Sequence, residues 1–514
     1  MSRDSYVAAL DIGTTTLRCQ IIDKNGECVG SAFDKVKLHY PEVNSVEIDP
    51  NELWESIITI MKNSLIDANI SAKQIKSVGI STQRATFITW SRKTGKPFHN
   101  FITWKDLRAW DYINKINRSW KTWFLRTGSF LVHLFTRQLK FNIVANLKFT
   151  SAHVTLRLLW LLRTNESIQK ALTVDDVMFG TVDTWLVNRL TGGSLYVTDI
   201  SNASATGMFD PFSLCWSIIP KYYNIPVSIM PQVVDNDYDF GNISSDIFGV
   251  PIKIGAVMSD QSASMYGSCS FKEDDLKITM GTGVFLNLNT AQCIRGGIHG
   301  TYPLVSWRVN NGLTYMTEAS GSDCGSLVEW MLATGLISNP KELNIMPNTI
   351  RNSSGVYFIP AFSGLSPPIS NENAATGFIG IKPDTKKEHM IRAVLESIVF
   401  KTVLVYDLLT SQCPSKFSCI KVDGGVSRNN FICQLLADLI QLPVKRLSAE
   451  MAALGVAFVA GLSSGFWKNK GEILEIDKTE VVFQPNDDLD HRKELLFELE
   501  QWQKATDRFK SWYQ

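Results

Sequence analysis

Asp11 ends a run of apolar residues and is followed by groups of the kind that bind phosphate. The segment reads Asp11-Ile-Gly-Thr14-Thr15-Thr16-Leu-Arg18. A carboxylate at the end of a buried strand is costly unless a cation or hydrogen-bond donors meet it, and Mg²⁺ would be such a cation. The groups that could hold a phosphate oxygen are those of Gly13, Thr14, Thr15, Thr16 and Arg18. The alternative is an acid that only caps a turn.

Two further junctions between a predicted strand and a predicted helix carry residues suited to catalysis or nucleotide binding. Asp260, in Ala256-Val-Met-Ser-Asp260-Gln261, could act as a general base, because a strand end is rigid and a substrate hydroxyl would be within its reach. The alternative for Asp260 is a helix cap. In Val422-Asp423-Gly424-Gly425-Val426-Ser427-Arg428-Asn429, a glycine pair precedes a helix start, which suits the α-phosphate and ribose of a nucleotide.

The threonine turn after Asp11 lies on a hairpin that the chain contains twice. Strands predicted over 7–12 and 17–22 flank this turn, and strands predicted over 276–280 and 284–288 flank Gly281-Thr282-Gly283. Helices are predicted over 389–409 and 429–440. A duplicated Gly-Thr hairpin is what a nucleotide held between two related domains requires, because small residues let backbone N–H groups approach phosphate. We therefore predict two α/β domains, 1–262 and 263–514, each with a mixed sheet covered by helices, flanking a nucleotide cleft.

The order of these motifs resembles that of a known family. Matching segments extend over nearly the whole chain and include Val46-Glu-Ile-Asp-Pro50, Ser81-Thr-Gln-Arg84, Phe179-Gly-Thr-Val-Asp-Thr-Trp-Leu186, Thr198-Asp-Ile-Ser-Asn-Ala-Ser204 and Met280-Gly-Thr-Gly283. On these segments the chain resembles the FGGY carbohydrate kinases and, among them, the glycerol kinases. The stretch from Arg84 to Trp90 is closely similar to a divergent animal branch. The resemblance implies two duplicated actin-like (ribonuclease H-like) ATPase domains, transfer of a phosphoryl group from ATP to a polyol hydroxyl, and a homodimer.

The resemblance also implies a role for each motif. Asp260 would take the proton of the substrate hydroxyl, and Asp11 would hold the Mg²⁺ that bridges the phosphates. The β- and γ-phosphates of ATP would be bound by Thr14, Thr15, Gly281 and Thr282, and the nucleoside by Gly425 and Asn429, beside the Thr16, Arg18 and Gly424 that the residues alone suggest. The substrate, most simply glycerol, would be bound by Arg84, Trp104, Asp260, Gln261 and Phe285.

Two departures from the family pattern concern the substrate rather than ATP. The family's Arg-Glu pair is Arg84-Ala85 here, and losing a charged acceptor for a hydroxyl would weaken binding by roughly 1.5 to 3 kcal/mol. The family's Tyr-Phe-Ser-Gly-Thr-Lys segment is replaced by His153-Val-Thr-Leu-Arg-Leu-Leu-Trp160. Two hypotheses remain open. One is a kinase for glycerol or another small polyol or sugar, and the other is a kinase-like protein that binds nucleotide but acts as a regulator or scaffold.

Composition and charge exclude other classes of protein. Fifty-one Lys and Arg against fifty Asp and Glu give a formal charge of +1. The electrostatic field of such a protein is too weak for a dedicated nucleic-acid binder. The apolar runs fall short of the ~18 to 20 residues that span a bilayer. The polar start, Met1-Ser-Arg-Asp-Ser5, leaves no room for a signal peptide, so we predict a cytoplasmic protein.

Residues 112–165 form the one strongly biased stretch of the sequence. They contain nine Lys or Arg, no Asp or Glu, and many aromatic residues. Such a stretch could make weak peripheral contact with an anionic membrane, where each basic residue near the headgroups contributes about 1 kcal/mol. A solvated loop and helix face, balanced by acids elsewhere, is the commoner explanation.

Overall fold

The structure, a computed structural model, describes residues 5–321, 323–448, 450–476 and 478–513. The chain divides into two compact units. Unit 1 consists of Met1–Cys269, Leu304–Tyr315 and Ala452–Asp477, and unit 2 of Ser270–Pro303, Met316–Met451 and Lys478–Gln514. The predicted division at residue 262 falls inside α11 (Asp260–Gly267), a helix of unit 1. Two later segments return to unit 1, so no single cut in the sequence separates the units.

A six-stranded mixed sheet forms the centre of unit 1, in the order β13-β14-β5-β1-β2-β3. The strands β14, β5 and β1 run parallel, and β1, β2 and β3 form an antiparallel meander. The meander follows from apolar runs separated by tight turns. The strands are β1 (Tyr6–Ile12), β2 (Thr16–Ile22), β3 (Cys28–Lys35), β5 (Ile75–Thr82), β13 (Asn242–Ile243) and β14 (Ile252–Ser259).

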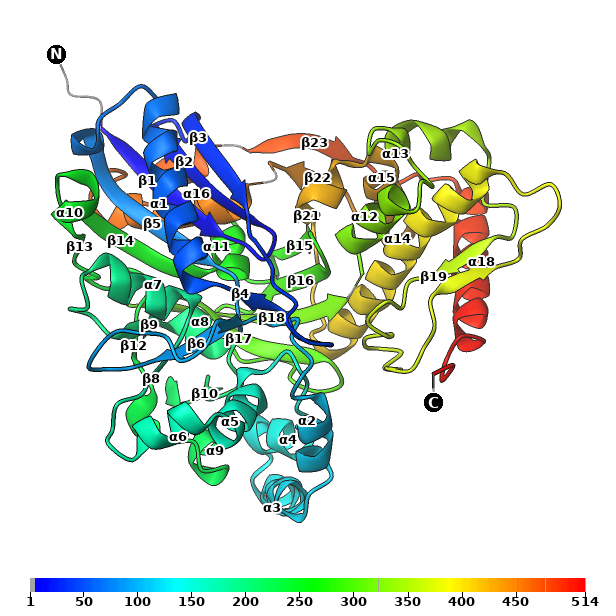
Figure 1. The fold of residues 1–514 in the computed structure, drawn as a ribbon. Coiled ribbons are helices and arrows are strands. Elements are labelled where there is room, and N and C mark those ends of the chain that lie inside the picture. Colours follow the sequence, from blue (N-terminus) through cyan, green and yellow to red (C-terminus); the bar gives the residue numbers. More distant parts are fainter. Residues whose placement is uncertain (1–4, 322, 449, 477, 514) are drawn as a thin grey trace. The chain divides into compact units, whose positions relative to one another are not determined.

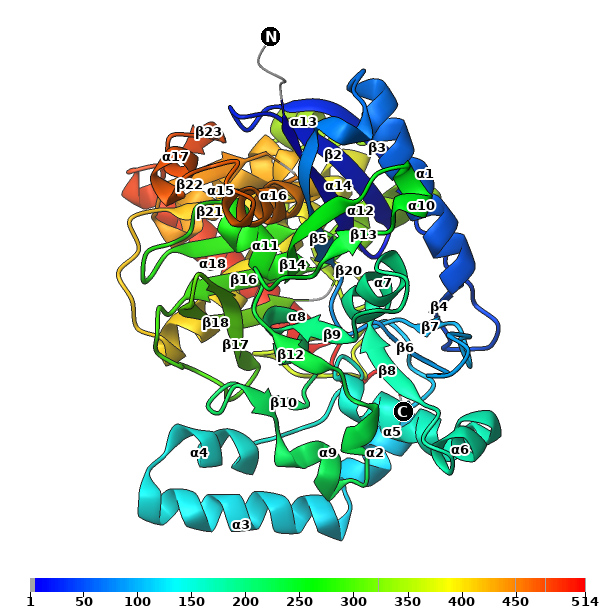
Figure 2. The ribbon, with the colours of Figure 1, turned by 90° about the vertical axis from the view of Figure 1, so that its left-hand side faces the viewer.

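Helices cover both faces of this sheet, with α1 (Pro50–Asp67) and α16 (Met451–Ser463) on opposite sides (Figure 2). On the α1 side, the ring centroids of Trp54 and Trp185 lie 6.4 Å apart in an edge-to-face arrangement. This contact joins α1 to α7 (Val182–Leu190). On the other side, α16 lies so close to β5 that a Cβ on Gly79 would stand 2.3 Å from the carbonyl oxygen of Val456. Only glycine allows this approach.

Unit 1 continues into a small second sheet and a helical extension. The sheet has the order β4-β7-β6-β8, and the extension packs on it through a buried apolar cluster that includes Phe87 and Phe179. The elements are β4 (Glu47–Ile48), β6 (Phe87–Trp90), β7 (Phe101–Ile102), β8 (Met178–Thr181), α2 (Trp110–Asn117), α3 (Trp120–Thr136), α4 (Leu139–Ala145), α5 (Val154–Thr164) and α6 (Glu166–Leu172).

Unit 2 repeats the strand order of the first sheet (Figure 1). The strands that lie wholly in unit 2 have the order β16-β15-β21-β22-β23, in which β15, β21 and β22 are parallel and β15 and β16 form a hairpin. The predicted duplication of the hairpin is therefore confirmed. These strands are β15 (Leu276–Met280), β16 (Val284–Asn289), β21 (Ile420–Asp423), β22 (Val444–Leu447) and β23 (Thr479–Phe483). The chain also forms β17 (Thr301–Val309) and β18 (Gly312–Gly321), whose residues are divided between the two units.

The helices of unit 2 agree closely with the sequence-based prediction. The helix predicted over 389–409 is α14 (Lys387–Gln412), and the one predicted over 429–440 is α15 (Asn430–Ile440). Both contribute to one buried apolar cluster with the strands β15, β16 and β21. The remaining elements near this cluster are α12 (Gly325–Ala333), β19 (Tyr357–Ile359), β20 (Gly377–Ile379) and α18 (Leu489–Asp507).

Candidate active site

The carboxyl ends of three parallel strands of unit 1 bring several predicted site residues to one edge of the sheet. In the strand register, Ile12 of β1 and Ser259 of β14 both lie level with Thr82 of β5. Asp11 and Asp260 are next to these positions, so the two carboxylates lie at the same edge, on either side of β5. The hydroxyl of Ser81 on β5 donates a hydrogen bond to Asp11 at 2.8 Å.

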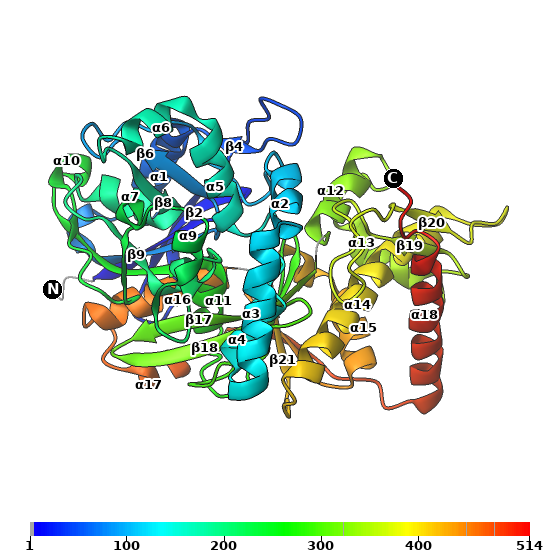
Figure 3. The same cartoon turned by 90° about the horizontal axis from the view of Figure 1, so that it is seen from below.

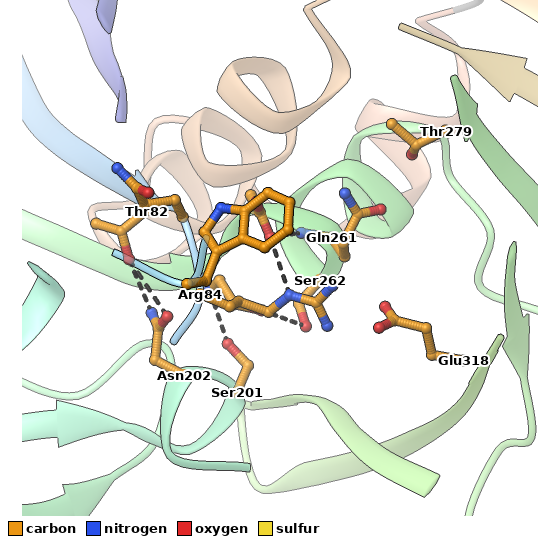
Figure 4. A network of polar contacts seen from close by, with 12 residues as sticks. Thr82, Arg84, Ser201, Asn202, Gln261, Ser262, Thr279 and Glu318 are labelled. Carbon is orange, nitrogen blue, oxygen red and sulfur yellow. Dashed lines mark hydrogen bonds and ion pairs between the residues drawn. The ribbon is translucent and has the colours of Figure 1, made fainter. Parts of the chain in front are cut away.

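Arg84 and Asp260 form an ion pair at this edge. Nε of Arg84 lies 3.2 Å from Oδ1 of Asp260, and the backbone N–H of Gln261 donates to the same oxygen at 2.7 Å. The Arg84 side chain is 12% exposed and that of Asp260 is 29% exposed, so the carboxylate is fixed yet accessible to a small molecule. Figure 4 shows Arg84 extending toward Gln261 and Ser262 of α11. The predicted substrate residues of unit 1 thus include a charged pair in contact.

Trp104 links the predicted substrate residues to the predicted phosphate turn. Its indole Nε1–H donates to the hydroxyl of Thr14 at 2.9 Å. The side-chain amide of Gln83 donates to the carbonyl of Gly13 at 3.0 Å, which ties the end of β5 to the same turn. Gln83 lies in the segment Ser81-Thr-Gln-Arg84, which matches the family, but its residue type and spacing alone do not predict this contact.

The other phosphate candidates of unit 1 lie on the hairpin itself. The carbonyl of Thr16 accepts a hydrogen bond from the N–H of Gly13, and that of Thr15 accepts one from the N–H of Val36. Arg18 stands directly opposite Asp11 in the antiparallel register of β1 and β2. Directly opposed residues point to the same face of a sheet, so the guanidinium and the carboxylate share one side of the hairpin.

A short helix behind the strand ends holds β5 and β14 in register. In α8 (Ile200–Ser204), the amide of Asn202 donates to the hydroxyl of Thr82 at 3.1 Å, and the N–H of Ser259 donates to the hydroxyl of Ser201 at 2.8 Å (Figure 4). Asp199 caps α8 and accepts hydrogen bonds from the backbone N–H groups of Ser201 and Asn202. This network fixes the residue immediately before Asp260.

Asp199 and Asp183 are both buried and lie close enough to interact. Burial, followed by the charge of Asp183, raises the pKa of Asp199 to about 7, and the hydrogen bonds from Ser201 and Asn202 oppose this rise. Burial also raises the pKa of Asp183, which accepts hydrogen bonds from Thr181 and Thr198. The folded protein therefore binds a proton at this pair at pH values where the unfolded chain has lost it.

This pair gives a pH dependence with a definite sign. Between the ordinary pKa of an aspartate, about 4, and about 7, the folded state holds the extra proton, so the free energy of unfolding falls as pH rises, by at most about 1.4 kcal/mol per pH unit. In Asp183→Asn the pKa of Asp199 should drop and this fall should become shallower. Urea unfolding at several pH values between 5 and 8 measures the slope of the unfolding free energy against pH for the unsubstituted protein and for Asp183→Asn.

Asp176→Asn is the control for this experiment. Hydrogen bonds donated by the backbone N–H of Lys93 and the hydroxyl of Ser91 lower the pKa of Asp176, so its contribution to stability is lost only as pH falls below the ordinary range of a carboxyl. The slope above pH 5 should match that of the unsubstituted protein. Parallel slopes for Asp183→Asn and the unsubstituted protein would show that the pair carries no shared proton.

Ala85, at the position of the family's glutamate, has an unusual backbone. Its φ is +58° and it is 7% exposed. The guanidinium of Arg157 donates to the carbonyl of Ala85 at 2.6 Å and to that of Thr103 at 2.7 Å. These carbonyls flank Arg84 and Trp104, so Arg157 fixes the backbone on which both side chains depend.

Arg157 corrects one expectation from the sequence. It belongs to the basic stretch 112–165 that was predicted to be a solvated face or a membrane contact, but it is fully buried in α5. Burial lowers the pKa of its guanidinium to about 10, against the opposing charge of Asp106. The signal available in the sequence was a lone arginine inside the apolar run Leu156-Arg157-Leu158-Leu159.

In unit 2, the turn between β15 and β16 lies against the start of α12. The N–H of Cys324 donates to the carbonyl of Thr282, and the N–H of Gly325 donates to that of Gly281 at 2.9 Å. A Cβ on Gly281 would meet no neighbouring atom within 4 Å, so this residue lies in open space. Phe285, the remaining predicted substrate contact, lies on β16 opposite Thr279.

The glycine pair after β21 also has a clear structural basis. Gly424 has φ +91°, and a Cβ there would stand 2.5 Å from the carbonyl oxygen of Met280, whereas a Cβ on Gly425 would meet nothing within 4 Å. Asn429 caps α15 by accepting from the N–H of Ile432, and its amide donates to the carbonyl of Leu343 at 2.7 Å. The side chain of Asn429 thus has a structural role in addition to the nucleotide contact predicted for it.

The donor set around Asp11 suits a metal ion that arrives with phosphate. In the part of the chain that the structure describes, no group of three or more His, Cys, Asp or Glu side chains is placed to hold a metal ion. Mg²⁺ commonly uses one or two carboxylates, water and substrate phosphates rather than a full protein cage. Asp11, a carboxylate beside the turn predicted to bind phosphate, fits that pattern.

Comparison with known proteins identifies the family. The N-terminal domain of the FGGY family of carbohydrate kinases matches residues 6–267, and the C-terminal domain of the same family matches residues 276–464. This chain belongs to the FGGY family of carbohydrate kinases. It is therefore an ATP-dependent kinase of the carbohydrate and polyol class by family membership, as predicted.

Relatives within the FGGY family span the whole chain. Glycerol kinase 5 of Homo sapiens is 40% identical over 510 residues, which cover 99% of this chain and 96% of that protein. Glycerol kinase 2 of Thermotoga maritima is 35% identical over 511 residues, 99% of each chain. The predicted similarity to a divergent animal branch of the glycerol kinases is thereby confirmed.

Solved structures support the fold. The glycerol kinase of Plasmodium falciparum with ADP matches with a TM-score of 0.85 at 26% identity and covers 99% of each chain. A gluconate kinase of Lactobacillus acidophilus has the same fold, with a TM-score of 0.82 at 20% identity and 99% coverage of each chain. The predicted FGGY fold, two domains built on mixed α/β sheets, is confirmed.

Proposed function

We propose that this FGGY kinase phosphorylates glycerol, or a small polyol close to it, with Asp260 as the general base. The observation that carries the proposal is the contact between Arg84 and Asp260 at 3.2 Å, beside Gln261. An arginine can donate to a substrate hydroxyl oxygen, while the adjacent carboxylate accepts a hydroxyl proton. The relatives named glycerol kinase point to the same substrate.

In this reaction, the protein would mainly position the two reactants and neutralise the negative charge of the phosphates. The substrate oxygen bonds to the γ-phosphorus of ATP, the bond from that phosphorus to the β,γ-bridging oxygen breaks, and the hydroxyl proton passes to Asp260. Mg²⁺ held by Asp11 and the phosphates would neutralise negative charge when it is bound. Holding the reactants in line and stabilising charge account for most of the rate in phosphoryl transfer.

The nucleotide would be held by both Gly-Thr hairpins and by the glycine pair. Thr14, Thr15 and Thr16 provide hydroxyl and N–H donors on the hairpin of unit 1. Thr282 on the β15–β16 turn would provide its hydroxyl, and Gly281, Gly424 and Gly425 have no Cβ that would keep a phosphate oxygen away from the backbone. Arg18, on the same side of its hairpin as Asp11, would pair with a phosphate oxygen.

A second candidate function is a family member that binds nucleotide but has lost turnover of glycerol. Ala85 favours it, because the methyl group offers no acceptor where the family's glutamate would bind a hydroxyl. The absence of the family's Tyr-containing segment near His153 points the same way. In this case, the ATP-binding residues would be retained and the protein would act as a regulator.

A substrate panel distinguishes the two candidates. Purified protein is incubated with ATP, Mg²⁺ and, separately, glycerol, dihydroxyacetone, erythritol and pentoses, and ADP release is measured. We expect turnover of glycerol or one of its small relatives, with a KM about ten- to a hundredfold above that of a kinase that has the glutamate. Binding of nucleotide without turnover of any compound would contradict the proposal and favour the regulator.

Ala85→Glu is the matched variant for the same panel. Ala85 already has the left-handed backbone conformation, so a glutamate there adds no new type of backbone strain. If the missing acceptor limits binding, this variant lowers the KM for glycerol. An unchanged KM would mean that the polyol is recognised elsewhere.

A further inference from the structure

The outward side of α3 carries a largely apolar surface. At about 100° per residue, seven of the eight exposed large apolar side chains of this helix, all except Val132, fall within an arc of roughly 140°. Only Thr122 of the helix is buried. Phe135 is 88% exposed and Trp120 is 67% exposed. This surface, here called the α3 apolar face, consists of Trp120, Trp123, Phe124, Phe130, Leu131, Leu134 and Phe135.

The opposite side of α3 is firmly attached to unit 1. The hydroxyl of Thr122 lies 2.8 Å from that of Tyr223, and the hydroxyl of Tyr222 donates to the carbonyl of Lys121 at 2.8 Å. Arg126 donates to the carbonyl of Leu147 at 2.7 Å, which joins α3 to the segment after α4. The α3 apolar face is therefore exposed because of how the helix is anchored, with Thr122, Leu125 and Arg126 turned inward.

Figures 2 and 3 show α3 as a straight helix at the outer border of unit 1, with α4 beside it. A helix of 17 residues is about 25 Å long. Among the described residues, no helix is long and apolar enough to cross a membrane. A helix with one apolar side can instead lie in the plane of a membrane interface, with that side among the acyl chains.

The chain segments on both sides of α3 are rich in basic residues. Residues 112–165 contain no Asp or Glu. Five of their basic side chains are exposed before and after α3, on α4 and just after α4: Lys115, Arg118, Arg137, Lys140 and Lys148. Two tryptophans lie in the first turn of α3. Indole rings favour the headgroup region, and lysine and arginine favour anionic headgroups, where each contributes about 1 kcal/mol.

We propose that the α3 apolar face docks unit 1 onto an anionic membrane surface. A second copy of the chain is a poorer occupant, because a symmetric contact would bring five exposed cations of each copy together. A bilayer interface supplies both an apolar layer for the aromatic side chains and anionic groups for the cations. The proposal concerns binding to lipid and does not depend on which polyol the kinase phosphorylates.

Vesicle pelleting of the full chain tests this inference. We expect the protein to pellet with phosphatidylcholine vesicles that contain about a third phosphatidylserine, to pellet at least tenfold less with phosphatidylcholine alone, and to be released by salt. Leu131→Glu/Phe135→Glu should reduce binding at least tenfold, because it places two charges on the α3 apolar face. Kinase activity in solution should be unchanged.

Leu496→Glu/Phe497→Glu is the matched control, because it makes the same substitutions at exposed residues of α18. It should pellet like the unsubstituted protein. Lys140→Glu/Lys148→Glu should weaken binding to anionic vesicles, and Lys341→Glu/Lys382→Glu on exposed lysines of unit 2 should not. Thermal melting checks that each variant is folded.

Three results would overturn the inference. They are equal pelleting with neutral and anionic vesicles, no pelleting of the unsubstituted protein with either, and unchanged pelleting of Leu131→Glu/Phe135→Glu. Light scattering without lipid tests the competing occupant. A molar mass that falls from dimer to monomer on introducing Leu131→Glu/Phe135→Glu would assign the α3 apolar face to a second copy of the chain.

Discussion

Asp260→Asn is expected to lower kcat by a factor of about a hundred to ten thousand, the range typical of losing a general base. The amide oxygen of the new residue can still accept hydrogen bonds from Nε of Arg84 and from the N–H of Gln261, so the local structure should be retained. An amide cannot take the proton of the substrate hydroxyl. ADP release with the best substrate of the panel measures kcat, and calorimetric titration with ADP checks that nucleotide binding is intact.

Glu52→Gln serves as the control for this variant. Glu52 is another carboxylate of unit 1 that pairs with a basic side chain, Lys37, but it lies on α1. It should leave kcat unchanged. If Asp260→Asn turns over substrate as fast as the unsubstituted protein, Asp260 is not the base, and the pair that it forms with Arg84 has only a structural role.

Lys277→Met is expected to destabilise unit 2 by about 3 to 5 kcal/mol, the usual cost of removing one partner of a buried ion pair. Nζ of Lys277 lies 2.9 Å from Oδ1 of Asp423, and the two side chains are 0% and 3% exposed. The substitution would leave the carboxylate of Asp423 buried without its cation. Gly424, which is proposed to bind the nucleotide, directly follows Asp423. The affinity for ADP should therefore fall as well. Chemical denaturation and ADP titration measure the two effects.

The chain offers a matched lysine on the neighbouring strand. Lys421 of β21 pairs with Asp275 at 3.9 Å, with side chains 19% and 24% exposed, so Lys421→Met should cost less than about 1 kcal/mol. The double variant Lys277→Met/Asp423→Leu should be more stable than Lys277→Met, because no unpaired charge is left buried. Equal losses for Lys277→Met and Lys421→Met would show that burial of the first pair has no energetic consequence.

The elements were predictable because their signals are local. Apolar runs of strand length separated by Gly-Thr turns specified both hairpins, and Asp49 followed by Pro50 specified the start of α1. The limits of α14 and α15 were predicted to within three residues, since helix ends depend on nearby capping residues. Asp11 and Asp260 could be singled out for the same reason, as each stands at the end of an apolar strand.

The contacts of the site were not predictable from such signals. The pairing of Arg84 with Asp260, and of Trp104 with Thr14, depends on the parallel register of β1, β5 and β14, which no short segment encodes. Arg157 belongs to a stretch whose composition predicts a solvated basic face, yet the packing of α5 buries it, where it donates to the carbonyls of Ala85 and Thr103. The composition of a segment shows that it contains a charged residue, but it does not show whether the fold buries that residue.

By itself, the sequence determined the family, the duplicated hairpins and the identity of the acidic and glycine residues suited to phosphoryl transfer, because these depend on residue type and short spacing. Only the tertiary structure decided that Asp11 and Asp260 share one edge of a sheet, that Arg157 supports the segment around Ala85, and that α3 turns its apolar side outward. The periodicity of α3 shows that one side is apolar, but whether that side is covered depends on residues far away in the chain.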